Sequence, residues 1–386
     1  MRASPRRRFA LSAVLVMSGL IAGAAGPAAA APSPTVTTVV SGLDNPRDLA
    51  FGSGDDLYVA EAGHGGNQGC FSDPEIGENC FGFTSGVSRV LVNKHDAYRV
   101  ESGLASMAAP DGTFATGIDG ISVLNGDIYG IMTGATAFLD LLPPSVTFDP
   151  ATRVKLTAQL GRLFLFDLGE PWRRLGKVGD VDFAWSGLPE NINRVPGGQF
   201  PDANPYGVLA LRDAIWVVDA ASNTIDRVSR SGEVTVRQFI PNPPVSDAVP
   251  TCIDQGPDGA LYIGELTGAG NAPGASTVWR YDPGDSTPLT KWATGLTAVT
   301  GCGFDEDGQF YATEFSTLGL DNAAPGTGAV VRVAPHSTSP ETVVSGLNFP
   351  GGFAAGLDSL FVSNWSIAPA DNHGGPTGEV LRISTD

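Results

Sequence analysis

The sequence predicts an all-β fold, a six-bladed β-propeller with four short strands in each blade. Two observations lead to this prediction. A unit of about 60 residues recurs along the chain, and self-similarity at such a period is the signature of repeat architectures. In addition, 50 Gly and 29 Pro among 386 residues fall largely between the apolar segments, where they favour turns and interrupt helices.

Each unit passes from a β-branched strand through a short apolar strand and a Gly/Asp turn to an aromatic strand and a last strand. In the first unit these pieces read TVTTVVSGL, DLAF, DLYVAE and GVSRVLV. The aromatic pieces of the other five units read IYGIM, IWVVDA, LYIGE, QFYATE and LFVSN. Short strands separated by turn residues are typical of propeller blades, whereas a pair of sandwiches gives no reason for a sixfold recurrence.

The two ends of this repeat predict how the ring closes. The first unit opens on TVTTVV, a strand that in other units completes the preceding blade, and the last unit ends on VLRI. We therefore expect the N-terminal strand to complete the last blade, which leaves no open strand edge. The single propeller domain is expected over residues 31–386.

Two long loops depart from the repeat, near residues 63–86 and 133–160, and long loops on a rigid scaffold often determine binding. In the second, Phe138–Leu142 followed by two prolines predicts a short helix. This loop either covers the central opening of the propeller or packs on its own leucines. A further irregular stretch is expected over residues 181–201.

Residues 1–30 predict a secretory signal peptide. Arg6, Arg7 and Arg8 precede an apolar run over residues 10–25 and a stretch of small residues, the layout of a cleavable signal. The Arg-Arg-x-Phe string also resembles a twin-arginine signal, so both export routes stay open. We expect a secreted monomer that does not insert in the membrane once the signal is cleaved.

The charge balance restricts the partners. The chain has 41 acidic and 23 basic residues, a net charge of −18. Such a surface repels phosphate backbones, which argues against a nucleic-acid partner. A small molecule, a glycan or a protein remains as the partner class.

The four cysteines predict two disulfides, because the count is even and the expected compartment is oxidising. Cys70 and Cys80 bracket a short loop rich in Gly, Asp and Glu, whereas Cys252 and Cys302 lie at nearly matching places in successive units. Free buried thiols are the alternative for the second pair. Zinc is disfavoured because no Cys-x-x-Cys string occurs.

Two segments carry a family resemblance. LYVAEAG after GLDNPRDLAF resembles the NHL and gluconolactonase-like group of six-bladed propellers. DANPYGVLAL followed by IWVVDAASNTI, with the secretory signal and the HGG string after the first LYVAE, resembles the ScyD/ScyE family of secreted bacterial propellers. The resemblance covers nearly all of the chain after the signal. It implies a secreted propeller without an assigned reaction, and the gluconolactonase-like group implies a metal in the central mouth.

The residues that close the aromatic strands are expected to form a ring at one face of the propeller, around its axis. They are Glu61, Met132, Asp219, Glu265, Glu314 and Asn364. Residues that begin the innermost strands are expected at the same mouth, namely Asn45, Arg47, Asp119, Asn204, Tyr206 and Thr251.

One interpretation of this ring is a site for Ca²⁺ or Mg²⁺, since like charges raise one another's pKa unless a cation lies between them. The ligands would be Glu61, Glu265, Glu314 and Asn204. The candidates for binding a ligand at the same mouth are Asp219, Asn364, Arg47, Tyr206, His64 and His373. The alternative is that the ring residues bind inner-strand backbone and water in a solvated tunnel, with Arg47 neutralising one or two of the acids.

His64 and His373 precede Gly-Gly in matching loops of the first and last units. Ring closure makes these loops neighbours, so the two imidazoles either act as acid and base, bind a transition metal or stay solvated without a partner.

Two functions follow as hypotheses. The first is a binding or scaffold module that uses the acidic central face. The second is a metal-dependent hydrolase or lactonase, in which a bound cation polarises a carbonyl and Asp219 or another acid of the ring activates water. The sequence has no Gly-x-Ser-x-Gly, His-Glu-x-x-His or Gly-x-x-x-x-Gly-Lys string, so serine-hydrolase, zinc-protease and nucleotide-hydrolysing functions lack their usual motifs.

Overall fold

A computed structural model describes residues 34–73, 77–167, 171–195, 198–367 and 376–384. The predicted signal peptide and His373 lie outside these residues. Within them, the strands form six antiparallel sheets, five with four strands and one with five. The chain is therefore all-β with few helices, as the sequence predicts.

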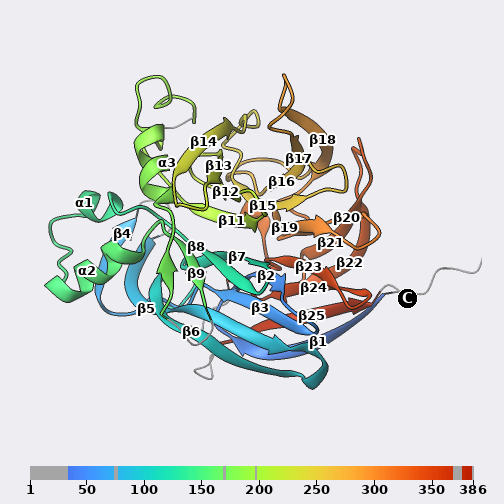
Figure 1. Ribbon diagram of the computed structural model, residues 1–386, viewed down its shortest axis with the longest axis horizontal. Coiled ribbons are helices and arrows are strands. Elements are labelled where there is room, and N and C mark those ends of the chain that lie inside the picture. The colour runs from blue at the N-terminus through green and yellow to red at the C-terminus, as the bar shows by residue number, and fades with distance from the viewer. Residues whose placement is uncertain (1–33, 74–76, 168–170, 196–197, 368–375, 385–386) are drawn as a thin grey trace, which may run out of the picture. The chain divides into compact units, whose positions relative to one another are not determined.

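The strands follow the chain from sheet to sheet in the order of the repeat (Figure 1). The first sheet contains β2 (Pro46–Phe51), β3 (Asp56–Glu61), β5 (Gly77–Leu91) and β4 (Gly69–Asp73), with β6 (Asp96–Ala108) also paired to β5. The second contains β7 (Ile118–Leu124), β8 (Asp127–Met132), β9 (Leu163–Phe166) and β10 (Arg173–Arg174). The third contains β11 (Pro205–Ala210), β12 (Ile215–Asp219), β13 (Thr224–Val228) and β14 (Val234–Phe239).

The remaining three sheets repeat this arrangement. The fourth contains β15 (Pro250–Gln255), β16 (Leu261–Glu265), β17 (Ser276–Tyr281) and β18 (Leu289–Leu296). The fifth contains β19 (Val299–Phe304), β20 (Phe310–Glu314), β21 (Gly328–Val333) and β22 (Glu341–Leu347). The sixth contains β23 (Phe353–Gly356), β24 (Ser359–Asn364), β25 (Gly378–Ser384) and the N-terminal strand β1 (Thr35–Leu43).

The first strands of the six sheets contact one another in succession. β2 contacts β7, and the contacts continue through β11, β15 and β19 to β23, which contacts β2. The strands approach closely where they carry glycine, because a Cβ at these positions would collide with a carbonyl oxygen of the neighbouring first strand or of the segment just before it. The glycines are Gly120, Gly207, Gly301 and Gly352.

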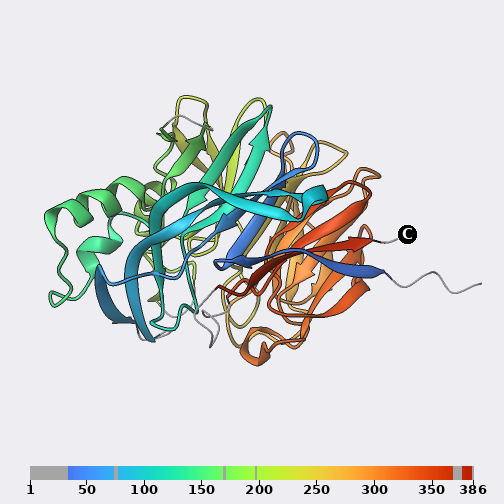
Figure 2. The same ribbon diagram turned by 90° about the horizontal axis from the view of Figure 1, so that it is seen from below.

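The N-terminal strand lies in the last sheet. β1 pairs antiparallel with β25, from Thr35 opposite Ser384 to Leu43 opposite Gly378 (Figure 2). The pairing that the sequence predicts for this strand is therefore present.

Apolar side chains from adjacent sheets pack together between them. Tyr129 and Ile131 of the second sheet, for example, join Val208, Ile215 and Val217 of the third in one buried cluster. Residues alternate between the two faces of a strand, and both faces of the second strands are covered. The second strands are consequently almost continuously apolar until their last residue.

Among the residues that the structure describes, three α-helices interrupt the strand pattern, α1 (Phe138–Leu141), α2 (Pro150–Gln159) and α3 (Val178–Ser186), besides the short 3₁₀ turns η1 (Val92–Lys94) and η3 (Leu320–Asn322). α1 confirms the predicted short helix. α2 and α3 were not predicted, although Asp149 and Pro150 are a recognisable helix start: the Asp149 carboxylate accepts from Ala151 N at 2.9 Å.

The segment expected to be a loop over residues 63–86 contains strand β4 and the first part of β5. These strands pair from Gly69 opposite Phe81 to Asp73 opposite Gly77, so the segment is an extended hairpin. The physical reason is that β5 begins at Gly77, before the strand expected from the repeat, and its first residues offer a strand edge with which β4 pairs. Both views place this hairpin beside α1 and α2 (Figures 1 and 2).

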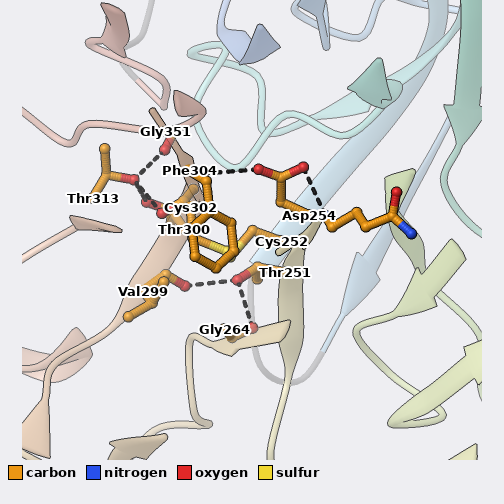
Figure 3. The surroundings of a disulfide bond; sticks show 12 residues. Thr251, Cys252, Asp254, Gly264, Val299, Thr300, Cys302, Phe304, Thr313 and Gly351 are labelled. Atoms are coloured by element: carbon orange, nitrogen blue, oxygen red, sulfur yellow. Dashed lines mark hydrogen bonds between the residues drawn. A yellow bond between two sulfur atoms is a disulfide. The ribbon is translucent and has the colours of Figure 1, made fainter. Parts of the chain in front are cut away.

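Both predicted disulfides are present. Cys70 and Cys80 occupy paired positions of β4 and β5, with their Cα atoms 4.0 Å apart. Cys252 of β15 and Cys302 of β19 join the first strands of two successive sheets, with a Cα separation of 5.6 Å (Figure 3). None of the described helices is long and apolar enough to span a membrane.

Candidate functional site

The six residues predicted to form a ring each end the second strand of their sheet. They are Glu61 of β3, Met132 of β8, Asp219 of β12, Glu265 of β16, Glu314 of β20 and Asn364 of β24. All six are buried, with 5% or less of each residue exposed. A buried carboxylate requires hydrogen-bond donors, and the donors present in each sheet show what these residues do.

Two of the acids bind the backbone that leads into the first strand of their own sheet. Asp44 N donates to Glu61 Oε2 at 2.6 Å, just before β2. Thr297 N donates to Glu314 Oε1 at 2.8 Å, just before β19. Each carboxylate therefore fastens the start of the first strand to the end of the second.

Asn364 makes the same connection with a carboxamide. Its Oδ1 accepts from Asn348 N at 2.8 Å, and its Nδ2 donates to Glu379 at 2.9 Å. In the fourth sheet, Glu265 accepts instead from Thr277 N at 2.9 Å and from the indole N–H of Trp279. These contacts agree with the alternative to a metal site, in which the ring residues form hydrogen bonds with the backbone.

The cation beside Glu61 is Arg99 and not the expected Arg47. Arg99 Nη2 lies 2.5 Å from Glu61 Oε2, and the Ser88 hydroxyl donates to the other oxygen. The sequence could not show this, because Arg99 lies on β6, the extra strand of the first sheet.

Burial changes the acidity of the ring. It raises the pKa of Glu265 and Glu314 to about 7 in each case. The pKa of Glu61 is also raised, since the effect of burial exceeds that of Arg99.

Asp219 belongs to a group of three buried carboxyls with Asp182 of α3 and Asp226 of β13. Asp219 accepts from Asn204 N at 2.9 Å and from the next amides along the chain. Asp182 has no N–H or hydroxyl donor among the described residues, and it contacts the carboxyls of Asp219 and Asp226. Burial first, and then the neighbouring carboxyls, raise the pKa of Asp182 well above its usual range. We infer that protons are shared within this group.

The predicted metal ligands are not brought together. In the described part of the chain, a single group of three His, Cys, Asp or Glu residues has its ligand atoms within 4.8 Å of one another, and it consists of Cys70, Glu78 and Cys80. Those two sulfurs form a disulfide and offer no thiolate. The carboxylates of Glu61, Glu265 and Glu314 do not form such a group, and each accepts hydrogen bonds within its own sheet. A cation held by these three residues and Asn204 stays a prediction.

A polar cluster on the first strands matches the sequence better. Arg47 of β2 lies with its Nε 3.5 Å from Asp119 Oδ1 of β7 and donates to the Ala115 carbonyl. Burial raises the pKa of Asp119 to about 7 despite Arg47, and that of Tyr206 on β11 to about 12. The charges of Arg47 and Asp119 both influence the pKa of Tyr206, so the three residues predicted at one mouth lie near one another, with a direct contact between Arg47 and Asp119.

Two other residues predicted at this mouth hold backbone in place. Asn45 Nδ2 donates to the Gly63 and Gly112 carbonyls at 2.8 and 3.1 Å. The Thr251 hydroxyl donates to the Val299 carbonyl at 2.7 Å, beside the second disulfide (Figure 3).

His64 has one acidic partner. Its Nδ1 lies 2.6 Å from Asp44 Oδ2, and 52% of the side chain is exposed. This carboxylate orients the imidazole, as in acid–base pairs. The predicted neighbour, His373, lies outside the described residues, so the pairing of the two imidazoles stays a prediction.

A cavity of about 320 Å³ is enclosed by the two insertions and the segment before β11. Four phenylalanines from different elements line it, Phe71 of β4, Phe81 of β5, Phe138 of α1 and Phe183 of α3. The rings of Phe71 and Phe138 lie 5.6 Å apart, centroid to centroid. The two segments that depart from the repeat thus supply much of one wall.

The polar groups of this cavity connect it with the predicted ring. Asn204, expected as a metal ligand, lines the cavity, and its Oδ1 accepts from the Thr133 hydroxyl. The Thr116 hydroxyl also lies in the wall and has no hydrogen-bond partner among the described residues. Neither the cavity nor Asp182 was predicted, because their side chains come from outside the repeat.

Comparisons with known proteins identify the fold. No protein family and no curated protein matches the sequence. A gluconolactonase from Xanthomonas campestris is 11% identical, with a TM-score of 0.51 over 91% of this chain and 89% of its own. A putative glucose dehydrogenase from Thermus thermophilus is 16% identical, with a TM-score of 0.51 over 91% of this chain and 100% of its own.

A protein of unknown function from Bacteroides thetaiotaomicron is 10% identical, with a TM-score of 0.52 over 91% of this chain and 76% of its own. These structural neighbours are gluconolactonase-like and NHL-type β-propeller proteins. The likeness is one of fold. At these identities it does not extend to activity.

Proposed function

We propose that this protein is a secreted, six-bladed β-propeller that acts as a binding module, with its ligand in the cavity between the β4–β5 hairpin, α1 and α3. The observation that carries the proposal is the cavity, which combines 320 Å³ of space, four phenylalanine rings and a few polar groups. Sites for small molecules are mainly apolar, with a small number of polar groups that fix orientation. The ligand class is a small, largely apolar molecule with one or two hydrogen-bonding groups.

Asn204 is the polar residue of the wall that would orient such a molecule. Asn204 is partly exposed in the cavity wall and supplies this polar contact, whereas the Thr116 hydroxyl is buried below the surface of the wall. Apolar burial against the phenylalanines would supply the remaining affinity.

Six blades in a closed ring are supported by the six sheets, by the contact of β23 with β2 and by the pairing of β1 with β25. Secretion is supported by the signal-like N-terminal sequence and by two disulfides, which persist in oxidising compartments. Kinship with the ScyD/ScyE family rests on the DANPYGVLAL segment, whose Asn204 lines the cavity.

A metal-dependent lactonase is the weaker candidate. It requires oxygen ligands that converge on one cation, whereas Glu61 and Glu314 are bound to backbone amides. The names of the structural neighbours do not compensate for this, since they are about 10% identical to this chain.

A cavity-filling variant tests the binding proposal. Ala221 lines the cavity, so Ala221→Phe should place a ring in it, and Ala324→Phe in an exposed loop before β21 is the matched control. The probe is Prodan, a neutral naphthalene with a ketone, followed by its fluorescence. We expect Ala221→Phe to weaken binding at least tenfold and Ala324→Phe to leave it unchanged. No binding to the original protein, or equal binding to Ala221→Phe, would contradict the proposal.

A further inference from the structure

A second concave surface has the opposite chemistry. A groove of about 760 Å³ runs along α2 and the segment between β10 and α3, and none of its lining residues lines the apolar cavity. The charged residues that line it are Arg153, Arg162, Arg174 and Lys177, with no Asp or Glu. A wholly cationic lining is notable in a chain with 41 acidic and 23 basic residues.

The lining residues of α2 give the groove its length. Pro150, Arg153, Val154, Thr157 and Ala158 follow the spacing of one helix face. Eight residues of α-helix span about 12 Å. Since the other three cations are outside α2, the groove has cations on both walls and is elongated, unlike a site for one small ion.

Two of the four cations are free to bind a ligand. Arg174 and Lys177 are exposed, and neither forms an ion pair with any residue that the structure describes. The Arg174 guanidinium lies 5.9 Å from the centroid of the Trp172 ring, a contact that leaves its charge unneutralised. Arg153 lies 2.5 Å from the exposed carboxylate of Asp140, a contact that water weakens.

Arg162 forms the base of the groove. Only 9% of its side chain is exposed, and its Nη1 lies 3.1 Å from Asp180 Oδ2. Its Nη2 donates to the Thr157 carbonyl at 3.3 Å, which ties it to α2. These contacts hold Arg162 in place and leave its guanidinium paired within the protein, so the charge offered to a ligand comes from Arg174 and Lys177.

We propose that this groove binds a short acidic oligosaccharide that carries carboxylate or sulfate groups on successive sugars. The Arg174 guanidinium and the Lys177 ammonium bind the oxyanions, and Val154, 70% exposed, packs against the apolar faces of the sugar rings. A nucleic acid or an anionic membrane is a poorer fit, because both extend well beyond the groove onto a molecule with a net charge of −18.

The experiment is a calorimetric titration of the full-length protein with trigalacturonic acid, with neutral maltotriose as the uncharged control. The test variant is Arg174→Gln with Lys177→Gln. The charge-matched control is Arg173→Gln with Lys94→Gln: Arg173 precedes Arg174 in β10, so the two point to opposite faces, and Arg173 does not line the groove. Lys177 precedes α3 without a side-chain capping bond, so its loss leaves that helix start intact.

We expect the test variant to bind trigalacturonic acid at least tenfold more weakly, because each charge-assisted contact contributes about that factor. The control should stay within about twofold of the original protein, and maltotriose should not bind. Thr157→Glu, an exposed position on the α2 wall, should also abolish binding, and it provides an independent test if the first variant does not fold.

Three results would overturn the proposal. An equal loss in the control variant would mean that only net charge matters. Tetraglutamate binding as tightly as trigalacturonic acid would assign the groove to an acidic peptide. Displacement of trigalacturonic acid by an equal concentration of inorganic sulfate would reduce the groove to a site for simple anions.

Discussion

The fourth to sixth sheets and the first to third sheets use the same strand pattern for different ends. In the fourth to sixth sheets, the residue that closes each second strand is Glu265, Glu314 or Asn364, and each binds nearby backbone. In the first to third, insertions add β4, β6 and the three α-helices. Both concave surfaces considered above are lined largely by those insertions.

This difference shows that residues which recur in the sequence units report on the fold more than on the function. Four of the six strand-end residues fasten the segment before the first strand to the end of the second, and they occur in sheets from both regions. They are Glu61, Asp219, Glu314 and Asn364. Glu265 binds the third strand of its sheet instead, and the second sheet has Met132 at this place. Chemistry specific to this protein is therefore to be sought where the units differ.

The largest expected effect concerns the disulfide that joins the fourth and fifth sheets. Cys252→Ser with Cys302→Ser removes a link that closes 50 residues, which corresponds to about 4 kcal/mol of loop-closure entropy. Cys70→Ser with Cys80→Ser opens a loop of 10 residues, which corresponds to about 3 kcal/mol. Guanidinium denaturation of both variants measures the difference.

Prodan binding gives these two variants a second comparison. Only the Cys70 and Cys80 variant should weaken it, because β4 carries Phe71 of the cavity wall. Equally weakened Prodan binding in both variants would show that the first three sheets and the last three do not act independently.

The next largest effect is expected in the cluster of buried carboxyls, where two substitutions should change the free energy of unfolding in opposite directions. Asp219→Asn should lower the free energy of unfolding by about 2 kcal/mol, because Asp219 accepts several backbone amides. Asp182→Asn should raise it by about 1 kcal/mol at pH 8, because the carboxamide donates to its acidic neighbours and, unlike the carboxylate of the unfolded chain at this pH, does not have to take up a proton on folding. Urea unfolding at pH 8 measures both, and a loss of stability in both variants would disprove proton sharing around Asp182.

A smaller effect depends on pH. Burial raises the pKa of Glu314 from 4.5 to about 7, so the unfolded chain releases this proton first as the pH rises. The contribution of Glu314 to stability is therefore greatest below about pH 4.5 and decreases up to about pH 7, by roughly 1–3 kcal/mol.

Glu314→Gln should flatten the stability profile over this window, and its carboxamide oxygen keeps the acceptor for Thr297 N. Denaturation curves at several pH values test this, with Glu306→Gln at an exposed position as the control. An unchanged slope in Glu314→Gln would show that Glu314 is ionised throughout.

The smallest expected effect follows addition or removal of metal. EDTA and then CaCl₂ should leave the melting temperature within about one degree, since a ligand of the native state stabilises by mass action and none is expected at the ring. A fall with EDTA that CaCl₂ reverses would restore the strand-end acids as metal ligands.

The strand pattern made much of the fold predictable. Alignment of the repeat units predicts where all six second strands end and which strand pairs with β1. Both disulfides were also predicted from the sequence. The orientation of the acids was not predictable, because the sequence does not show whether a strand-end carboxylate reaches the axis or the adjacent amide. The distance from Asp44 N to Glu61 decides this for the first sheet.

The candidate sites were less predictable, because they lie outside the repeat. The capping pair Asp149 and Pro150 could have predicted α2. Asp182 gives no such signal, since an isolated acid in an irregular stretch is usually exposed, and only α3 packed on the third sheet buries it.

The pairing of β1 with β25 also governs the order in which the protein can be completed during synthesis. β1 is synthesised first and can pair only after β25, the last strand, has been made. Pairings between such distant segments form slowly. Until they form, β1 is an unpaired edge. A chaperone that shields Thr35–Leu43, or a circular permutation that makes β1 follow β25 directly, should therefore speed maturation while the contacts of the finished sheet stay the same.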